Sequence, residues 1–317
     1  TRSSGRGVVR ELSIYPIKSC AGVMLHSASA QKRGFAGDRT FQVTDRNGKY
    51  CTPRDEDKVK LFHVRCRLDG DSLHLDVPNK QLNKQRVAPL WVQLSAPTTP
   101  AVVEVLAAPK PITLRDYGDK AAAWLEAATG IEGCRLTGIG DGYERKVEVN
   151  ESQGDAIPVE DAVVSLADEA PYLLTSSSSL ADLNRRLRQR GKAAVGMERF
   201  RPNIVLGGLW PWEEDCIKRV RIGGVEFLAW QRCGRCTMTT IDRDDLTRCG
   251  EPLATLSTFR ERDHGQRNFG MHLIPAPGIP RDGIDITVGD KVEVLEFDET
   301  RRAEWRLLHG SDGSLLF

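Results

Sequence analysis

The sequence lacks the fingerprints of several large enzyme classes. It has no GxGxxG segment after a strand, no GxxxxGK[ST] loop and no HExxH segment. A GxSxG nucleophile elbow and the plant-type spacing of four iron–sulfur cysteines are also absent. The motifs therefore do not predict a Rossmann dehydrogenase, a P-loop NTPase, a zincin or an α/β-hydrolase.

Long apolar runs and net charge are scarce as well. No stretch approaches 18 uninterrupted apolar residues, so no membrane-spanning helix is predicted. The 45 Lys and Arg residues nearly balance the 44 Asp and Glu residues, which leaves a net charge of +1. Such a chain has no global attraction to nucleic acid or to an acidic membrane. An anionic ligand must therefore be held by a local cluster of cations.

The eight cysteines are too thinly spread over 317 residues for a disulfide-stapled scaffold. We expect a reducing compartment in which the thiols are free. A hydrophobic content of 40% is typical of a soluble globular protein with two domains or one large one. Because the first residue is Thr1 and not Met, we expect that an N-terminal segment, which could carry an anchor or targeting peptide, has been removed.

Short strands and tight turns dominate the first half of the chain. Asn47-Gly48 and Asp69-Gly70-Asp71 each predict a β-hairpin. The Ala-rich segment Asp119–Ala128 predicts a helix. Gly138–Asp155 is rich in Gly, Asp and Glu without periodicity, which is typical of a connector.

Evenly spaced strands continue beyond the connector. They predict a closed or nearly closed barrel, because the helices between them are too few for a doubly wound parallel sheet. A strand is predicted at Ala162–Leu166 and a helix at Leu180–Arg190, opened by a capping box of Ser179 and Asp182. Residues 301–317 are predicted to be a tail. The fold class is therefore mainly β with inserted helices (α+β).

The tetrapeptide Cys233-Gly234-Arg235-Cys236 is the most informative motif. Two cysteines at this spacing can chelate zinc, exchange disulfides or give one soft thiolate to a redox metal. A zinc site needs more ligands, and neither Cys216 nor Cys249 belongs to a second CxxC pair. A dithiol motif should open a helix, whereas Cys236–Ile241 is predicted to be a strand. Two merely buried thiols are a further alternative, but the neighbouring arginines favour a thiolate.

Cations in three predicted loops are candidates for an anion pocket. Lys18-Ser19, Arg39 and Arg201 are each unremarkable alone, because loop cations are usually solvated. The fold would have to bring them together. The run Thr175–Ser179 precedes a predicted helix, where free N–H groups and hydroxyls suit a phosphate. On local grounds, simple helix capping explains this run better.

Six segments in one order resemble a known family. They are Tyr15–Cys20, Gly37–Arg39, Ala167-Asp168, Leu180–Asn184, Phe200–Ile204 and Arg235–Asp242. In this order the segments resemble the mitochondrial amidoxime reducing component family, which belongs to the MOSC group of molybdenum-cofactor proteins. The resemblance runs from about Val8 to Phe297. Its most specific parts are the RPN segment and the RC..TT.D segment.

The resemblance implies a two-domain architecture. We expect a MOSC-type N-terminal β-barrel domain at residues 1–137, a MOSC β-barrel domain at 138–300 and a tail at 301–317. The family binds its cofactor in the cleft between the two domains. That cofactor is a dioxo molybdenum centre held by a pterin dithiolene and one Cys thiolate, a set of soft sulfur donors.

The resemblance also implies roles for single residues. The family's Cys of RC..TT.D ligates molybdenum, which puts the metal-binding and catalytic roles on Cys236. The run Thr175–Ser179 departs from the family's commoner Ser-Glu-Ala-Ser. The residues implied to bind the cofactor are Lys18, Ser19, Arg39, Asp168, Thr175, Ser176, Arg201, Asn203, Cys233, Gly234 and Arg235.

The implied activity is the reduction of N-hydroxylated or N-oxygenated compounds such as amidoximes and hydroxylamines, with nitrite as a further candidate. No fused ferredoxin domain is matched, so the electron donors implied are cytochrome b5 and NADH-cytochrome b5 reductase. The location implied is the cytoplasm, or the cytosolic face of the mitochondrial outer membrane if the removed segment held an anchor. Two alternatives stay open: a MOSC-type protein that carries cofactor sulfur or merely holds cofactor, and a zinc-stabilised barrel without catalysis.

Overall fold

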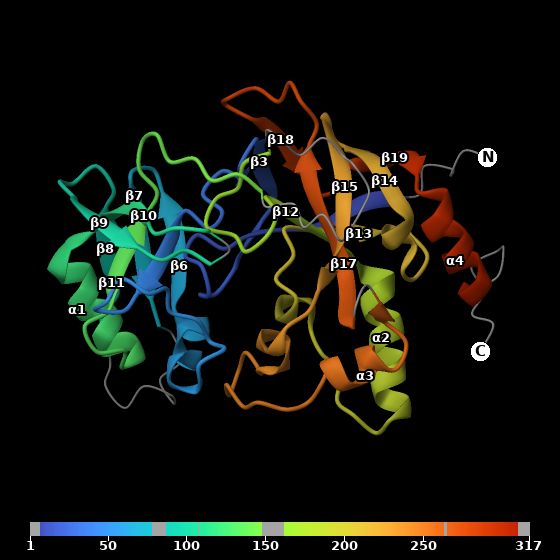
Figure 1. The fold of residues 1–317 in the computed structure, drawn as a ribbon, viewed down its shortest axis with the longest axis horizontal. Coiled ribbons are helices and arrows are strands. Elements are labelled where there is room, and N and C mark those ends of the chain that lie inside the picture. The colour runs from blue at the N-terminus through green and yellow to red at the C-terminus, as the bar shows by residue number, and fades with distance from the viewer. Residues whose placement is uncertain (1–6, 78–86, 107, 148–161, 263–264, 310–317) are drawn as a thin grey trace.

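The computed structural model describes residues 7–77, 87–106, 108–147, 162–262 and 265–309. Figure 1 shows two lobes side by side, one built from the first half of the chain and one mainly from the second. Strands make up most of both lobes, and the few helices are interspersed among them along the chain. The predicted fold class is confirmed.

Two small antiparallel sheets form the first lobe. One has the strand order β5 (Phe41–Thr44), β11 (Arg135–Gly138), β10 (Ile112–Asp116) and β9 (Thr99–Val103). The other has the order β6 (Arg65–Asp69), β7 (Ser72–Asp76) and β8 (Leu90–Gln93). Their apolar faces share one core with the predicted helix, α1 (Gly118–Thr129), which buries Trp124 and Leu125. Both predicted hairpins are present, with Asp69 paired to Ser72 and Thr44 paired to Tyr50.

A closed ring of seven strands forms the second lobe. Its order is β12 (Tyr172–Ser176), β13 (Ile204–Gly207), β1 (Gly7–Ile14), β19 (Lys291–Phe297), β14 (Ile217–Ile222), β15 (Val225–Gly234) and β17 (Gln266–Pro275). Pairing of β17 with β12 closes the ring. Gly270 allows that pairing: its φ is +86°, and a Cβ there would lie 2.5 Å from the carbonyl oxygen of Leu174.

The first strand of the chain belongs to this ring of the second lobe. β1 pairs with β13 and β19, and β2 (Val23–Leu25) extends it. β3 (Ser27–Gln31) pairs with β18 (Ile284–Thr287) and with β4 (Gly34–Phe35), while β16 (Glu261–Arg262) pairs with β17. The chain therefore crosses twice between the lobes. The domain limits 1–137 and 138–300 stay predictions.

The predicted strand Cys236–Ile241 is wrong. Thr237–Thr240 form a short 3₁₀ helix instead. The hydroxyl of Thr239 donates to the carbonyl oxygen of Cys236 at 2.9 Å, and that of Thr240 donates to Thr237 at 2.7 Å. These local hydroxyl bonds bend the backbone back on itself, in competition with a β-ladder.

The predicted strand Ala162–Leu166 is also wrong. Among the described residues, an isolated bridge between Lys146 and Val163 is the one β-pairing of this buried segment. Its carbonyl groups are instead used by side chains, since Lys18 Nζ donates to Leu166 and Arg145 donates to Ser165. Cationic side chains therefore replace the backbone ladder here.

The helix predicted at Leu180–Arg190 is α2 (Ser177–Gln189), but the capping box is wrong. Ser179 lies inside the helix, and its hydroxyl donates to Glu214 Oε2 at 2.7 Å. The short α3 (Leu253–Ser257) lies near α2 in Figure 1.

The predicted tail is helical where it is described. Residues 301–309 lie in α4 (Glu299–His309), which packs Trp305 into an apolar cluster of the second lobe. The Trp305 indole N–H also donates to the carbonyl oxygen of Pro211 at 2.8 Å. Residues 310–317 and the part of the predicted connector from 148 to 155 lie outside the described residues.

Candidate cofactor site

A cavity of about 260 Å³ is lined by loops of the first lobe and by the open end of the seven-stranded ring. Ten of the predicted site residues line it. They are Lys18, Ser19, Arg39, Asp168, Arg201, Asn203, Cys233, Gly234, Arg235 and Cys236. The fold thus brings together residues from four distant parts of the sequence.

Lys18 is a buried cation aimed at the segment before β12. Its Nζ donates to the carbonyl oxygen of Leu166 at 2.6 Å and lies 2.8 Å from Asp168 Oδ1. Burial lowers the pKa of Lys18, and the carboxylate of Asp168 opposes that shift. Two of the three ammonium donors are thereby occupied, and the third can meet an anion.

Arg39 and Arg201 sandwich Tyr15. Their guanidinium carbons lie 4.2 Å and 4.1 Å from the centre of its ring. Arg39 also donates to Asp38 at 2.7 Å and to Asn203 Oδ1 at 3.0 Å. Asn203 in turn anchors to the first strand, because its amide donates to the carbonyl oxygen of Ser13 at 3.1 Å. The stack fixes the cations to the ring.

Backbone strain is concentrated at this wall. Ser19, Arg39 and Arg201 have φ values of 70°, 46° and 55°, a region that residues other than glycine rarely adopt. Strained backbone persists where the surrounding structure fixes it, and it gathers at functional sites. The three residues are therefore held in place for a reason other than local stability.

The Cys236 thiol opens onto the cavity. It is only partly buried, and Arg54 Nη2 lies 3.6 Å from its sulfur. The same guanidinium group contacts Asp168 Oδ2 at 3.1 Å. Burial raises the pKa of Asp168, but Lys18 and Arg54 outweigh this and hold the pKa well below its usual range. Asp168 is thus an anion that contacts two cations, and one of them, Arg54, lies beside the sulfur.

The other residues of the CGRC segment support the turn between the two thiols. Arg235 donates to the carbonyl oxygens of Phe200 at 2.9 Å and Phe269 at 3.0 Å. A Cβ on Gly234 would lie 2.4 Å from Gln266 Oε1, so glycine leaves room for that side chain. Cys233, at the end of β15, is 5% exposed and lines the cavity.

Thr175 and Ser176 do not line the cavity. Both are fully buried, and their hydroxyls are used locally. Thr175 Oγ1 contacts Met197 Sδ at 3.3 Å, and Ser176 Oγ lies 2.6 Å from Ser178 Oγ. Their proposed part in cofactor binding therefore has no support from this geometry.

Sequence reasoning missed several residues of the cavity wall. They are Arg54, Ala167, Glu169, Ala170, Leu173, Arg199, Phe200, Met238, Thr239, Gln266 and His272. Arg54 follows the first hairpin, and His272 lies in the middle of a barrel strand, so neither stands in a recognisable motif. Ala167, Phe200, Met238 and Thr239 lie inside the segments that carry the resemblance, so these four had a signal.

No group of three or more His, Cys, Asp or Glu side chains is placed to hold a metal ion in the part of the chain that is described. Cys216 is buried in an apolar cluster, and burial raises the pKa of its thiol. Cys249 is exposed and donates to the carbonyl oxygens of Thr240 and Glu251. The zinc-stabilised barrel thus lacks a ligand set among the described residues.

The cavity suits a bulky anionic ligand that carries a metal ion able to bind sulfur. Six cationic side chains line it against the carboxylates of Asp168 and Glu169. Burial lowers the pKa of Arg201, and the nearby charge of Arg39 adds to that effect. Buried cations so crowded are stabilised by a bound anion. Cys236 adds a sulfur donor of the kind that molybdenum bound to a dithiolene takes.

Comparison with known proteins agrees with this geometry. The MOSC N-terminal beta barrel domain matches residues 6–132, and the MOSC domain matches residues 161–293. The mitochondrial amidoxime-reducing component 1 of Homo sapiens is 32% identical over 302 residues, which cover 91% of this chain and 83% of that protein. The chain belongs to the amidoxime-reducing component family.

Other relatives extend the picture of the family. The mitochondrial amidoxime reducing component 2 of Bos taurus is 33% identical over 270 residues, covering 83% of this chain and 75% of that protein. A molybdenum cofactor sulfurase of Drosophila mojavensis is 27% identical over 292 residues, which are 90% of this chain and 34% of that protein. Membership of the amidoxime-reducing component family gives the chain a role connected with the molybdenum cofactor.

Several names among the relatives carry the word mitochondrial. Within the described residues, every helix is too short or too polar to cross a bilayer.

Proposed function

We propose that this protein is a molybdenum-dependent reductase of N-hydroxylated and N-oxygenated compounds, with amidoximes and hydroxylamines as substrates and nitrite as a further one. The observation that carries the proposal is the position of the Cys236 thiol, which opens onto the same cavity as Lys18 and Arg39. The names of relatives that match most of the chain support the reduction of amidoximes.

In this proposal Cys236 is the metal ligand and the catalytic residue. Lys18, Arg39 and Arg201 neutralise the phosphate and the other negative charge of the pterin through charge-assisted hydrogen bonds. Ser19, Asp168, Asn203, Cys233, Gly234 and Arg235 complete the binding wall. When bound, the cofactor supplies the two-electron chemistry, while the protein supplies orientation, charge and access.

The residues around Cys236 have separate tasks. Arg54 contacts both the Cys236 sulfur and Asp168, so it keeps positive charge beside the metal ligand. Asp168 orients Lys18 toward the cavity. The strained backbone at Ser19, Arg39 and Arg201 holds these residues in place before a ligand arrives, which lowers the entropy lost on binding.

The electron donors we propose are cytochrome b5 and NADH-cytochrome b5 reductase, which together deliver single electrons from NADH. The proposed location is the cytoplasm or the cytosolic face of the mitochondrial outer membrane.

Purified protein from a host that makes the molybdenum cofactor tests the proposal. We expect about one molybdenum per chain, since Cys236 offers a single thiolate for the metal, and turnover of benzamidoxime with reduced cytochrome b5. Protein that binds molybdenum and pterin but reduces neither benzamidoxime, a hydroxylamine nor nitrite would contradict a reductase.

The similarity to a molybdenum cofactor sulfurase favours one second candidate, a protein that carries cofactor sulfur on Cys236. A persulfide on Cys236, detected by intact-mass analysis before and after treatment with a reductant, together with absent turnover, would support the carrier.

A further inference from the structure

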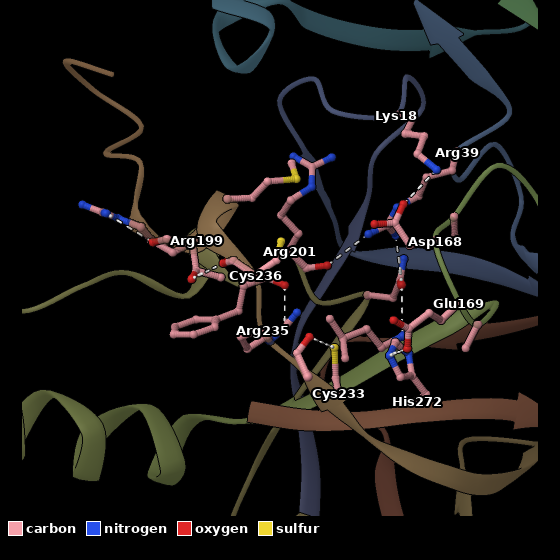
Figure 2. Close-up of a pocket in the computed structure, with 18 of the residues that line it drawn as sticks. Lys18, Arg39, Asp168, Glu169, Arg199, Arg201, Cys233, Arg235, Cys236 and His272 are labelled. Atoms are coloured by element: carbon pink, nitrogen blue, oxygen red, sulfur yellow. Dashed lines mark hydrogen bonds and ion pairs between the residues drawn. The ribbon is translucent and has the colours of Figure 1, made fainter. Parts of the chain in front are cut away.

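One wall of the cavity holds three titratable groups, of which Glu169 and His272 lie outside the sequence motifs and Cys233 opens the CGRC segment. Figure 2 shows Glu169, His272 and Cys233 grouped below Lys18 and Asp168. Glu169 precedes β12, His272 is in β17, and Cys233 is near the end of β15. All three line the cavity.

The three groups run from solvent to the interior. The side chain of Glu169 is 49% exposed, whereas that of His272 is 9% exposed. Glu169 Oε2 lies 3.2 Å from His272 Nε2, and it accepts a hydrogen bond from the amide of Gln231 at 2.9 Å. Gln231 is opposite His272 across the β15–β17 ladder, so the ladder register fixes the carboxylate against the imidazole.

Charge couples His272 to Cys233. Burial raises the pKa of the Cys233 thiol, but Arg235 and His272 more than offset this and lower the pKa. Burial lowers the pKa of His272, but the sulfur of Cys233 and the carboxylate of Glu169 outweigh it and raise the pKa to about 10. The contact between Glu169 and His272 thus joins a half-exposed carboxylate to a buried imidazole on the cavity wall.

The proposed reduction consumes protons. An amidoxime takes up two electrons and two protons, its N–O bond breaks, an N–H bond forms on the nitrogen, and the oxygen leaves as water. The electrons come one at a time from the haem-protein donor. Among the described residues of the cavity wall, the arginines stay protonated at all working pH values, and Lys18 is engaged with Asp168. His272 is the only histidine among those residues.

We propose that Glu169, His272 and Cys233 form a proton relay that carries protons from solvent to the substrate nitrogen. This inference rests on the proposed reductase function. His272 donates a proton to the nitrogen, an atom more basic than imidazole in the amidine product. Glu169 accepts a replacement proton from hydronium or a buffer acid in the solvent and passes it to His272. The negative charge of Glu169 and the sulfur of Cys233 favour the protonated imidazole between turnovers.

Two readouts test the relay. The first is turnover of benzamidoxime by molybdenum-loaded wild type and by His272→Gln and Glu169→Gln variants, from pH 6 to pH 9. We expect His272→Gln to slow turnover at least roughly tenfold, in keeping with the loss of a general acid, with unchanged molybdenum content. Glu169 is exposed, so Glu169→Gln keeps the fold and slows turnover less. His26→Gln, at an exposed histidine, is the matched control.

The second readout does not depend on activity. The pH at which iodoacetamide alkylates Cys233 at half its maximal rate, followed by peptide mass spectrometry, reports the ionisation of the thiol. We expect this pH to rise in His272→Gln and to stay constant in His26→Gln. An unshifted profile in His272→Gln would overturn the pairing on which the relay rests.

The outcomes separate the two proposals. A wild type without turnover of any N-hydroxylated substrate overturns the reductase function, and the relay with it. A wild type that turns over benzamidoxime while His272→Gln keeps full activity at every pH overturns the relay alone. Slowed turnover together with a shifted alkylation profile supports both.

Discussion

Cys66 in the first lobe and Cys233 in the cavity are a natural pair for comparison. Each is 5% exposed. Cys66 packs with three other buried thiols, Cys20, Cys51 and Cys134, in an apolar core, and burial raises its pKa to about 11. Cys233 faces Arg235 and His272, and its pKa is lowered. Equal burial therefore produces an inert thiol in one lobe and an ionisable one in the other, because the neighbours decide.

Of all substitutions that separate the cavity thiols from the core thiols, Cys236→Ser is expected to have the largest effect. Cys236→Ser should fold normally and lose essentially all reductase activity, more than the roughly 10- to 100-fold typical of changing a residue that only hydrogen-bonds to a metal ligand. Benzamidoxime turnover and bound molybdenum measure the loss, and Cys66→Ser is the matched control in the core. A fully active Cys236→Ser variant would refute the metal assignment.

The next effect is the alkylation rate of wild-type protein. At pH 7.5 iodoacetamide should modify Cys233 at least about tenfold faster than Cys66, because the pKa of Cys233 is lowered and that of Cys66 is raised to about 11, and the thiolate is the nucleophile. As the pH rises, the rate at Cys233 should level off first, whereas that at Cys66 should climb until about pH 11. Equal alkylation rates at Cys66 and Cys233 would contradict the expected difference between the two thiols.

A smaller effect concerns two cations of the cavity wall, Lys18 and Arg39. Lys18→Ala and Arg39→Ala should each weaken cofactor retention by roughly tenfold, since a hydrogen bond to a charged group contributes about 1.5–3 kcal/mol. The pterin and molybdenum content of purified protein measures this, alongside the thermal midpoint, which should change less. Lys49→Ala, at an exposed lysine, is the control. Equal occupancy in wild type and both variants would count against the anion pocket.

The smallest effect is expected in the core itself. Cys66→Ala should lower the free energy of unfolding by about 1 kcal/mol, as small truncations of buried side chains do, with unchanged cofactor content. Urea unfolding measures it. A loss of molybdenum in this variant would show that the core thiols are not separate from the site.

Sequence patterns predicted the barrel, the hairpins and both longer helices, because local turn residues and hydrophobic periodicity determine each of these elements. The cavity is different, since it is assembled from loops and strands far apart in the chain. The ordered segments pointed to ten of its residues, but only the register of β15 on β17 shows that His272 lies opposite Gln231 and beside Glu169. Cofactor binding by Thr175 and Ser176 was implied by the resemblance, whereas their hydroxyls make local contacts.

The position of the first strand in the ring has a consequence for synthesis. β1 precedes the first lobe in the chain, whereas its two ring partners, β13 and β19, follow it. Domains generally fold as units while the chain grows. The first lobe, with its own core, can therefore close while β1 still lacks both ring partners. The loops that carry Lys18 and Arg39 can thus be in place before the ring that leads to Cys236 closes.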